Sequence, residues 1–317
     1  MQQNRTPRSS NSSSTGKRNT IHSLHHWSRR LKRKILVFGK GLLGRAIEEY
    51  LPENFTGKVL SHKECDIMNI EEVRRITSEY KPDVIINTAA ISNLEYCEAH
   101  SQEAFIVNSG GAGYIASVAR DRGIKILHIS TDYVFDGSKG DSYSEFDTPN
   151  PLSVYAKSKY EGENLVQFSG ADYLIARVQW LFGEHRNTFV DKAVENLKGG
   201  KEIDAIIDQY GSPTYTKYVV YAISKLIGAE SKGIFHIASE GVCSRVEQVQ
   251  YICDVLGLDK SLIVERRWSD FTGVAKRPYR IELSKKRLLE ATGFVMPDWK
   301  RQTEEYVMKN YSSGGSR

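Results

Sequence analysis

A glycine-rich turn between an apolar run, residues 35–38, and a helical pattern, residues 42–50, constrains the fold of this chain more than any other segment. Gly39, Gly41 and Gly44 have the spacing Gly-x-Gly-x-x-Gly. Glycines at this spacing let the backbone turn tightly and let a pyrophosphate reach the N–H groups at the start of a helix. The turn therefore predicts a dinucleotide-binding strand–helix unit, with an ordinary glycine-rich turn as the alternative.

Strand-like and helix-like segments alternate from this turn to residue 178. One of the strand-like runs, residues 83–87, is nearly all apolar, as expected for a strand that helices cover on both faces. The alternation predicts βαβ units with right-handed crossovers, and hence a Rossmann-type, doubly wound parallel sheet of the α/β class. The expected strands are residues 35–38, 58–60, 83–87, 125–130 and 173–178, and the expected helices are residues 42–50, 70–80, 101–120 and 153–168.

We expect three parts in the chain. Residues 1–34 form a disordered basic extension, and residues 35–180 form the dinucleotide-binding domain. Residues 181–310 form mainly a smaller substrate-binding lobe, because the alternation becomes irregular there, while segments near residues 203–237 return to the first domain. Further helices are expected at residues 189–197, 218–227, 246–256 and 284–290, and strands at residues 203–207 and 233–238.

The formal net charge of +5 is unevenly distributed over the 317 residues. Residues 1–34 hold nine of the 44 Lys and Arg residues and no Asp or Glu, so the rest of the chain carries 35 basic and 39 acidic side chains. This mildly acidic body gives no reason to expect nucleic-acid binding. Three interpretations of residues 1–34 stay open: a solvated tail, an arm for an anionic partner, or an organelle transit peptide.

The four cysteines, Cys65, Cys97, Cys243 and Cys253, are scattered and form no Cys-x-x-Cys pair. This spacing argues against a disulfide framework or a zinc site and fits a reducing compartment, so we expect a cytoplasmic protein. No apolar run approaches the roughly 18–20 residues of a membrane helix, so no membrane association is expected.

The end of the second expected strand bears on the choice between NAD and NADP. NAD-binding sites of this kind carry an acidic residue there, which binds the ribose 2′-hydroxyl. This chain has Ser61, followed by His62 and Lys63, which can both be cationic. With no carboxylate expected at the strand end, we predict NADPH as the cofactor, with NADH as the alternative.

Two segments carry the residues of a proton-transfer site. Thr131 and Asp132 follow the fourth expected strand, at the edge of a parallel sheet where ligands bind. Tyr155 and Lys159 are four residues apart in an expected helix, which places both on one face. An ammonium beside a phenol stabilises the phenolate and lowers its pKa, so that the phenol can exchange a proton near neutral pH. Thr131 can donate a hydrogen bond to the same substrate oxygen.

Together with the glycine turn, these features resemble the extended short-chain dehydrogenase/reductase family. Further motifs narrow the resemblance to its dTDP-4-dehydrorhamnose reductase branch, over residues 34–305. The motifs are Asn87-Thr88-Ala89-Ala90, Val107-Asn108, the segment from Ser130 to Gly137, Tyr143-x-Glu145-x-Asp147-x-Pro149, Arg177-x-x-Trp180-x-x-Gly183, Asp208-Gln209-x-Gly211-x-Pro213-Thr214 and Arg277-Pro278.

The resemblance implies NADPH-dependent reduction of the 4-keto group of a nucleotide-activated 6-deoxy sugar, with dTDP-4-dehydro-L-rhamnose as the favoured substrate. It assigns catalysis to Thr131, Tyr155 and Lys159. The implied cofactor-binding residues are Gly39, Gly41, Leu42, Leu43, Gly44, Ser61, His62, Lys63, Asp66, Ile67, Thr88, Ala89, Ala90, Tyr155 and Lys159. The implied substrate-binding residues are Asn108, Thr131, Asp132, Trp180, Gln209 and Arg277, of which Arg277 would bind the diphosphate.

The chain also departs from the family pattern. Some members carry an acidic residue after the third glycine, at a metal-bridged dimer interface, whereas this chain has Arg45 and Ala46, so we expect no metal. The protein would be a monomer or a homodimer. Two other functions stay open: reduction of a UDP-linked or epimeric 4-keto sugar, and a non-catalytic regulatory role, because the regulatory subunit of methionine adenosyltransferase is similar in sequence.

Overall fold

The computed structural model describes residues 32–273 and 275–312, so most of the predicted N-terminal extension lies outside the described residues. The first strand, β1 (Arg33–Phe38), begins two residues before the predicted start. Arg33 and Lys34 belong to the strand because they pair with the beginning of β2 (Phe55–Leu60). The apolar run in the sequence marks only the buried part of β1, whereas pairing with a neighbouring strand determines its full length.

Six parallel strands form the central sheet, in the order β10-β5-β4-β3-β1-β2. This doubly wound arrangement confirms the predicted fold class. From β1 the chain crosses to β2 on one side, and from β2 it crosses back to β3 on the other side of β1. The switch point of the sheet therefore lies between β1 and β3, where ligands of such folds bind. The other strands are β3 (Val84–Asn87), β4 (Lys125–Thr131), β5 (Tyr173–Val178) and β10 (Gly233–Ile237).

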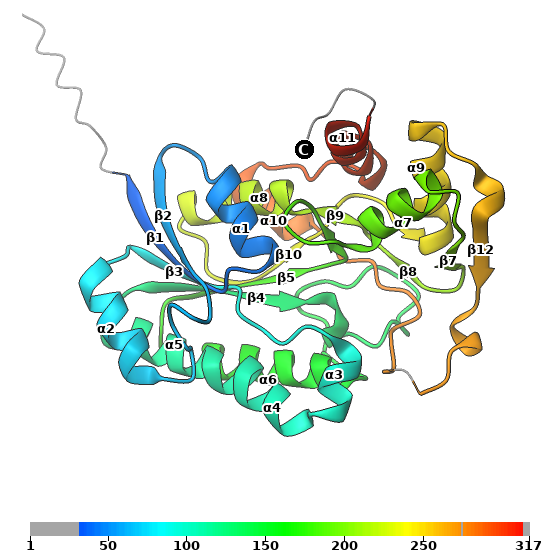
Figure 1. The fold of residues 1–317 in the computed structure, drawn as a ribbon. Coiled ribbons are helices and arrows are strands. Elements are labelled where there is room, and N and C mark those ends of the chain that lie inside the picture. The colour runs from blue at the N-terminus through cyan, green and yellow to red at the C-terminus, as the bar shows by residue number, and fades with distance from the viewer. Residues whose placement is uncertain (1–31, 274, 313–317) are drawn as a thin grey trace, which may run out of the picture. The chain divides into compact units, whose positions relative to one another are not determined.

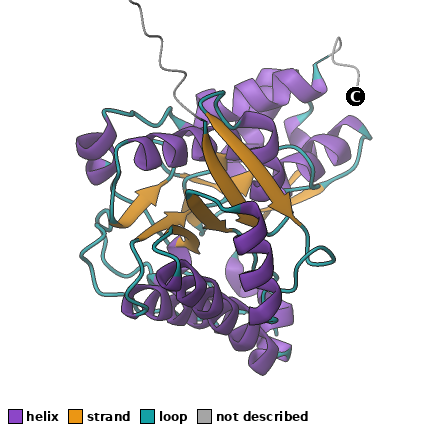
Figure 2. Ribbon diagram, turned by 90° about the vertical axis from the view of Figure 1, so that its left-hand side faces the viewer, coloured by secondary structure: helices purple, strands orange, loops and turns teal. Residues whose placement is uncertain are grey.

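Side chains of the central strands alternate between two buried layers. Ile35 and Val37 belong to one apolar cluster, and Leu36 and Phe38 belong to the other. Helices cover both faces of the sheet (Figures 1 and 2). One layer contains α1 (Leu42–Tyr50), α8 (Thr216–Gly228), α10 (Lys286–Thr292) and α11 (Trp299–Tyr311). The other contains α2 (Ile70–Tyr80), α3 (Leu94–Ala99), α4 (Ser101–Phe105), α5 (Gly111–Asp121) and α6 (Val154–Phe168).

The single helix predicted at residues 101–120 is interrupted in its middle. A π-helical turn, η1 (Ile106–Gly110), separates α4 from α5. The glycines here have a packing reason, because a Cβ on Gly111 would lie 2.5 Å from Ile67 Cδ1. Close approach of this segment to its neighbours therefore favours small residues that weaken a regular helix.

The chain after residue 181 contributes β10, α8, α10 and α11 to the central sheet and one of its covering layers, and otherwise forms short paired strands and the α-helices α7 and α9. The predicted strand at residues 203–207 does not return to the central sheet: β7 (Ile203–Ile206) pairs with β12 (Ile263–Arg266), while β10 does join the sheet beside β5. Long-range pairing of this kind leaves no local signal in the sequence. The remaining elements are β6 (Leu181–Phe182), α7 (Phe189–Lys198), β8 (Tyr210–Gly211), β9 (Thr214–Tyr215), β11 (Cys243–Ser244) and α9 (Arg245–Leu256).

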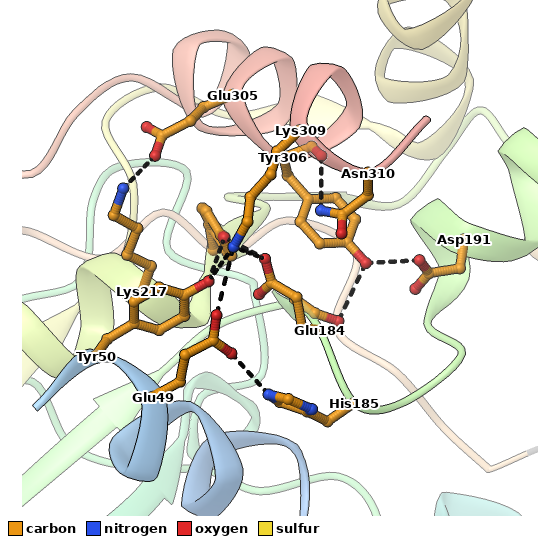
Figure 3. A network of polar contacts seen from close by, with 12 residues as sticks. Glu49, Tyr50, Glu184, His185, Asp191, Lys217, Glu305, Tyr306, Lys309 and Asn310 are labelled. Carbon is orange, nitrogen blue, oxygen red and sulfur yellow. Dashed lines mark hydrogen bonds and ion pairs between the residues drawn. The ribbon is translucent and has the colours of Figure 1, made fainter. Parts of the chain in front are cut away.

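A polar network joins α1 and α11 to the segment after β6 (Figure 3). Lys309 Nζ lies 2.7 Å from Tyr50 Oη and 2.9 Å from Glu184 Oε1. The Tyr215 hydroxyl donates to the same Glu184 oxygen at 2.6 Å, and Glu49 approaches Lys309 at 3.4 Å. We call these five residues the α1–α11 network. Its charges and hydroxyls are satisfied mainly by one another.

Candidate active site

The glycine turn lies at the carboxyl end of β1 and leads into α1. Gly39 has φ +106°, and a Cβ there would lie 2.5 Å from the Ala89 backbone nitrogen. A Cβ on Gly44 would lie 1.9 Å from the Gly39 carbonyl oxygen, so both positions require glycine. Gly41, the N-cap of α1, makes no side-chain cap and has no atom within 4 Å of an added Cβ. The helix N-terminus is therefore open toward a ligand, as a pyrophosphate-binding turn requires.

A cavity of about 480 Å³ lies beside this turn, and we call it the turn cavity. Nine of the predicted cofactor residues line it: Gly39, Gly41, Ser61, His62, Asp66, Ile67, Thr88, Ala89 and Ala90. Thr88 fixes the turn, because its hydroxyl donates to the Gly39 carbonyl at 2.7 Å. Lys63 is exposed and does not line the cavity. Five further residues, which were not predicted, also line the cavity: Lys40, Cys65, Ile91, Glu103 and Val107.

The end of β2 differs from the prediction, because a carboxylate does reach it. The turn after Ser61 brings back Glu64, whose Oε2 accepts from the Ser61 N–H at 2.8 Å and from the Ser61 hydroxyl at 2.7 Å. These hydrogen bonds from Ser61 lower the pKa of Glu64. Both donors of Ser61 are therefore engaged. Of the two predicted cationic residues, His62 lines the turn cavity and Lys63 does not.

A second cavity of about 380 Å³ shares Gly41, Thr88 and Ala90 with the turn cavity, and we call it the Tyr155 cavity. The structure brings all three predicted catalytic residues to its wall. Thr131 is the last residue of β4, and Tyr155 and Lys159 belong to α6. Ser153 caps α6 by accepting a hydrogen bond from the Ala156 N–H. The other predicted residues on this wall are Leu42, Leu43, Gly44, Asp132 and Trp180.

Tyr155 and Lys159 are both deeply buried, and this changes the predicted proton chemistry. Burial lowers the pKa of Lys159 to about 8. Its Nζ donates to the Ile129 carbonyl at 2.7 Å and lies 3.2 Å from His128 Nε2. Burial raises the pKa of Tyr155, and the nearby Thr131 hydroxyl opposes this only in part. The lowered phenol pKa expected from the sequence is therefore wrong for this structure: Tyr155 is a protonated phenol near neutral pH.

Trp180 marks the far wall of the Tyr155 cavity. It has a left-handed backbone, φ +40°, which is unusual for a bulky residue and occurs preferentially at functional sites. A Cβ on Gly211 would lie 2.6 Å from the Trp180 ring, so the motif glycine makes room for the indole. The resemblance predicted Trp180 as a substrate residue, and the structure places it on the cavity wall.

Arg245, which the sequence analysis missed, stacks on Trp180. Its guanidinium carbon lies 3.6 Å from the Trp180 ring centre and 4.8 Å from that of Phe189. Arg245 lines the Tyr155 cavity, and among the described residues it forms no ion pair with a carboxylate. Burial lowers its pKa to about 10. A half-buried guanidinium held by aromatic rings, without an anionic partner, is suited to bind an anionic ligand.

Two further wall residues carry polar groups that were not predicted. Arg186 also lines the Tyr155 cavity and adds a second guanidinium. Ser130 is 2% exposed, and within the described part of the chain its hydroxyl has no hydrogen-bond partner. A helix start at Ser244 and Glu247 was recognisable as a capping box, but nothing local places Arg245 opposite Trp180.

Three predicted substrate residues do not reach either cavity. Arg277 donates to Glu95 Oε1 at 2.7 Å and stacks on Trp268. Asn108 is buried and bonds both backbone groups of Ile91 as well as Ser158. Gln209 donates to the Tyr133 hydroxyl at 3.3 Å. Each of these three side chains is thus engaged by other residues of the protein.

The fold and the site define the class of protein. An open helix N-terminus at the switch point of a parallel sheet, next to a buried Thr–Tyr–Lys group, is the arrangement of a nicotinamide-dinucleotide-dependent oxidoreductase of Rossmann type. The chain belongs to the RmlD substrate binding domain family, whose model matches residues 33–312. The resemblance inferred from the motifs is therefore confirmed.

Curated relatives cover nearly the whole described chain. The spore coat polysaccharide biosynthesis protein SpsK of Bacillus subtilis is 32% identical over 282 residues, which is 88% of this chain and 99% of the relative. A dTDP-4-dehydrorhamnose reductase of Aggregatibacter actinomycetemcomitans is 34% identical over 282 residues, 84% of this chain and 96% of the relative.

Solved structures agree with these relatives. A dTDP-4-dehydrorhamnose reductase of Bacillus anthracis in complex with NADP has a TM-score of 0.83 at 31% identity, and covers 88% of this chain and 100% of its own. The orthologue from Clostridium acetobutylicum has a TM-score of 0.80 at 33% identity, with 86% and 98% covered. A dTDP-glucose 4,6-dehydratase of Streptomyces venezuelae, at 20% identity and TM-score 0.73, shares the fold.

No three His, Cys, Asp or Glu side chains in residues 32–273 and 275–312 are placed to hold a metal ion. In the same ranges, no helix has the length and apolar character needed to cross a membrane.

Proposed function

We propose that this protein reduces the 4-keto group of a nucleotide-activated 6-deoxy sugar with NADPH, converting dTDP-4-dehydro-L-rhamnose to dTDP-L-rhamnose. One observation carries the proposal: Thr131, Tyr155 and Lys159 line a cavity that meets the turn cavity at Gly41, Thr88 and Ala90. A dinucleotide on the glycine turn can thus extend toward the catalytic groups. The reductases among the relatives and solved structures support this substrate and this cofactor.

The residues of the turn cavity fit a dinucleotide. Gly39 and Gly44 occupy positions where a Cβ would collide with backbone, while Gly41 leaves the helix N-terminus clear for phosphate oxygens. NADPH, when bound, supplies the hydride that adds to the carbonyl carbon of the sugar. Lys159, on the cavity wall next to Tyr155, would hold the ribose hydroxyls of the cofactor.

Tyr155 serves as the general acid in this proposal. The carbonyl oxygen gains negative charge as its carbon accepts hydride, and the phenol of Tyr155 donates its proton to that oxygen. The raised pKa of Tyr155 keeps the phenol protonated before the reaction, which is the state that reduction requires. Thr131 donates a hydrogen bond to the same oxygen and stabilises the developing charge.

Arg245 takes the role that the sequence assigned to Arg277. A nucleotide sugar brings a diphosphate, and a guanidinium binds phosphate oxygens through two parallel hydrogen bonds. Among the described residues Arg245 forms no ion pair and lines the cavity, whereas Arg277 is engaged by Glu95. Arg186, on the same wall, adds a second positive charge for the diphosphate.

Turnover with defined sugar nucleotides tests the proposal. NADPH oxidation is followed with enzymatically made dTDP-4-dehydro-L-rhamnose, with its UDP counterpart, and with NADH in place of NADPH; the C4 configuration of the product is read by NMR. We expect turnover with the dTDP sugar and NADPH to be fastest. No turnover with any sugar would contradict the proposal, and nucleotide binding without turnover would favour the regulatory alternative.

A cytoplasmic location is part of the proposal. All four cysteines are buried and free of disulfides, which fits a reducing compartment.

A further inference from the structure

The hydroxyl of Thr131 has one proton, and the groups around its oxygen decide where that proton points. Thr131 Oγ1 accepts from the Tyr133 N–H at 3.2 Å and lies 3.0 Å from Asp132 Oδ1. A threonine hydroxyl can donate one hydrogen bond and accept two. The direction of the Thr131–Asp132 bond therefore decides whether Thr131 keeps a donor for a substrate oxygen.

The orientation of Asp132 is set by Gln179. The Gln179 amide is itself fixed, because its Oε1 accepts from the Ser212 N–H at 3.0 Å and its Nε2 donates to the Ile281 carbonyl at 3.0 Å. Nε2 also donates to Asp132 Oδ2 at 2.9 Å. One carboxyl oxygen of Asp132 is thus occupied as an acceptor, and the other faces Thr131.

The two charge states of Asp132 give opposite hydrogen bonds at Thr131. An ionised Asp132 has no proton, so Thr131 must donate to it, and a carbonyl oxygen in the cavity then meets only the lone pairs of the Thr131 hydroxyl. In a protonated Asp132 the proton lies on Oδ1, because Oδ2 accepts from Gln179. Asp132 then donates to Thr131, whose own proton is free to point into the cavity.

Both charge states are accessible near neutral pH. Asp132 is 3% exposed, and burial raises its pKa to about 7 although Gln179 and Thr131 hydrogen-bond to it. The titratable and charged groups that face it within the described chain are Tyr133, Tyr155 and Arg245. Burial keeps both phenols neutral at this pH, and the Arg245 cation opposes the protonation of Asp132.

We propose that Asp132 is a positioning residue whose proton sets the direction of the Thr131 hydrogen bond, so that Thr131 donates to the substrate carbonyl only while Asp132 is protonated. This inference rests on the proposed reductase function. It gives Asp132 a role through Thr131, in place of the direct substrate contact that the resemblance implied. Because the protonated form is active, kcat/KM falls as the pH rises through the midpoint of Asp132.

The variant D132N tests the direction of the bond. Gln179 Nε2 selects the amide oxygen of the new side chain, which leaves the amide N–H₂ to donate to Thr131 permanently. We expect the alkaline fall of kcat/KM to move to higher pH, so that D132N exceeds wild type about tenfold one pH unit above the wild-type midpoint. An alkaline midpoint equal to that of wild type would overturn the proposal. So would loss of activity at every pH with NADPH binding intact, since Asp132 would then act on the substrate directly.

The variant T131V gives an independent answer should D132N fail to fold. Without the hydroxyl, the charge state of Asp132 can no longer change the hydrogen bond to the substrate oxygen. We expect a lower kcat/KM at acidic pH and no fall at the Asp132 midpoint, and the double variant T131V/D132N should titrate like T131V alone. A T131V enzyme that retains the wild-type midpoint contradicts the proposal, whereas T131S, which keeps the hydroxyl, should retain it.

A measurement without turnover separates this inference from the proposed function. The carboxyl carbon of Asp132 is followed by NMR in wild type and T131V labelled with ¹³C-aspartate. If the ionised carboxylate accepts from Thr131, removing that hydroxyl raises the Asp132 midpoint. An unchanged midpoint overturns the proposal even when the enzyme reduces sugar nucleotides. A raised midpoint supports the hydrogen-bond direction even if the substrate proves to be different.

Discussion

Two clusters of this molecule combine a lysine with a tyrosine, and they differ in what surrounds the lysine. In the Tyr155 cavity, Lys159 Nζ contacts a carbonyl oxygen and an imidazole, and no carboxylate of the described residues forms a hydrogen bond with it. Burial lowers its pKa to about 8. In the α1–α11 network, burial alone would lower the pKa of Lys309, but hydrogen bonds to Tyr50 and Glu184 raise it (Figure 3).

The comparison shows why one cluster suits chemistry and the other suits architecture. The α1–α11 network neutralises its cation internally, and burial raises the pKa of Tyr50 to about 12, so its groups keep one charge state. The Tyr155 cavity holds Lys159 and Arg245 without ion pairs among the described residues, beside Asp132 with a pKa of about 7. Groups left unneutralised at a cavity wall are available to bind anions and move protons.

The largest difference between the clusters should appear on removing each phenol hydroxyl. Y155F deletes the proposed general acid, whose contribution in enzymes is about 10²–10⁴-fold, so kcat should fall by that factor with NADPH binding retained. Y50F deletes a hydroxyl of the α1–α11 network and should change kcat less than about twofold. Steady-state kinetics on both variants measures this. Undiminished turnover by Y155F would contradict the proposed difference between the Tyr155 cavity and the α1–α11 network.

Arg245, which forms no ion pair among the described residues, should contribute more to binding of the sugar nucleotide than Arg277, which is paired with Glu95. Losing hydrogen bonds to a charged group costs about 1.5–3 kcal/mol, so R245A should raise KM for the sugar nucleotide roughly 10- to 150-fold with a smaller change in kcat. R277A, which breaks the contact with Glu95, should raise KM less than about threefold, and R245K should lie between. Equal effects of R245A and R277A would show that Arg277 also binds the substrate.

Stability at alkaline pH should distinguish the two lysines. Lys159 has a folded pKa of about 8, below that of an unfolded lysine near 10.4, so between these values the unfolded chain binds more protons and the folded state gains stability as pH rises. The unfolding free energy of wild type relative to K159M should therefore rise by about 2–3 kcal/mol from pH 8 to pH 10.5. Urea unfolding across this range measures it, and a flat difference would show that Lys159 is not desolvated.

The smallest effect is expected at Lys309. Its folded pKa is raised, so its stabilising contribution is fully present below the unfolded value near 10.4 and is lost only as pH rises through the folded pKa. The side chain is 47% exposed, so screening limits its contribution, and K309M should lower the unfolding free energy by less than about 1 kcal/mol. Between pH 8 and pH 10 the wild-type to K309M difference should stay constant, in contrast to K159M.

The part of the site that local sequence determines was predictable. Gly39, Gly41 and Gly44 lie together because they are near neighbours in the sequence. The spacing of four residues brings Tyr155 and Lys159 to one helix face. The same holds for most central strands and helices. Glu64 was missed although it is three residues from Ser61, because a tight turn rather than a periodic element returns its carboxylate to the strand end.

The rest of the site depends on segments that are distant in the chain. Arg245 meets Trp180 only because α9 packs against the connection after β5, and the choice between Arg245 and Arg277 follows from which guanidinium finds a carboxylate. Asn108 was predicted to touch substrate, yet η1 turns it toward Ile91 and Ser158. Polar residues of one motif can either face a ligand or satisfy the backbone, and the motif does not distinguish the two.

By itself the sequence determined the βαβ alternation, the phosphate-binding turn and the Thr–Tyr–Lys set, because these depend on backbone propensity, periodicity and short spacings. Only the tertiary structure decided the charge states of the buried side chains and that Arg245 is the cation at the cavity wall. Those depend on burial, which raises the pKa of Tyr155 and Asp132 and lowers that of Lys159, and on the number of partners each group finds. Desolvation and long-range contacts are properties of the packed chain, so no local pattern encodes them.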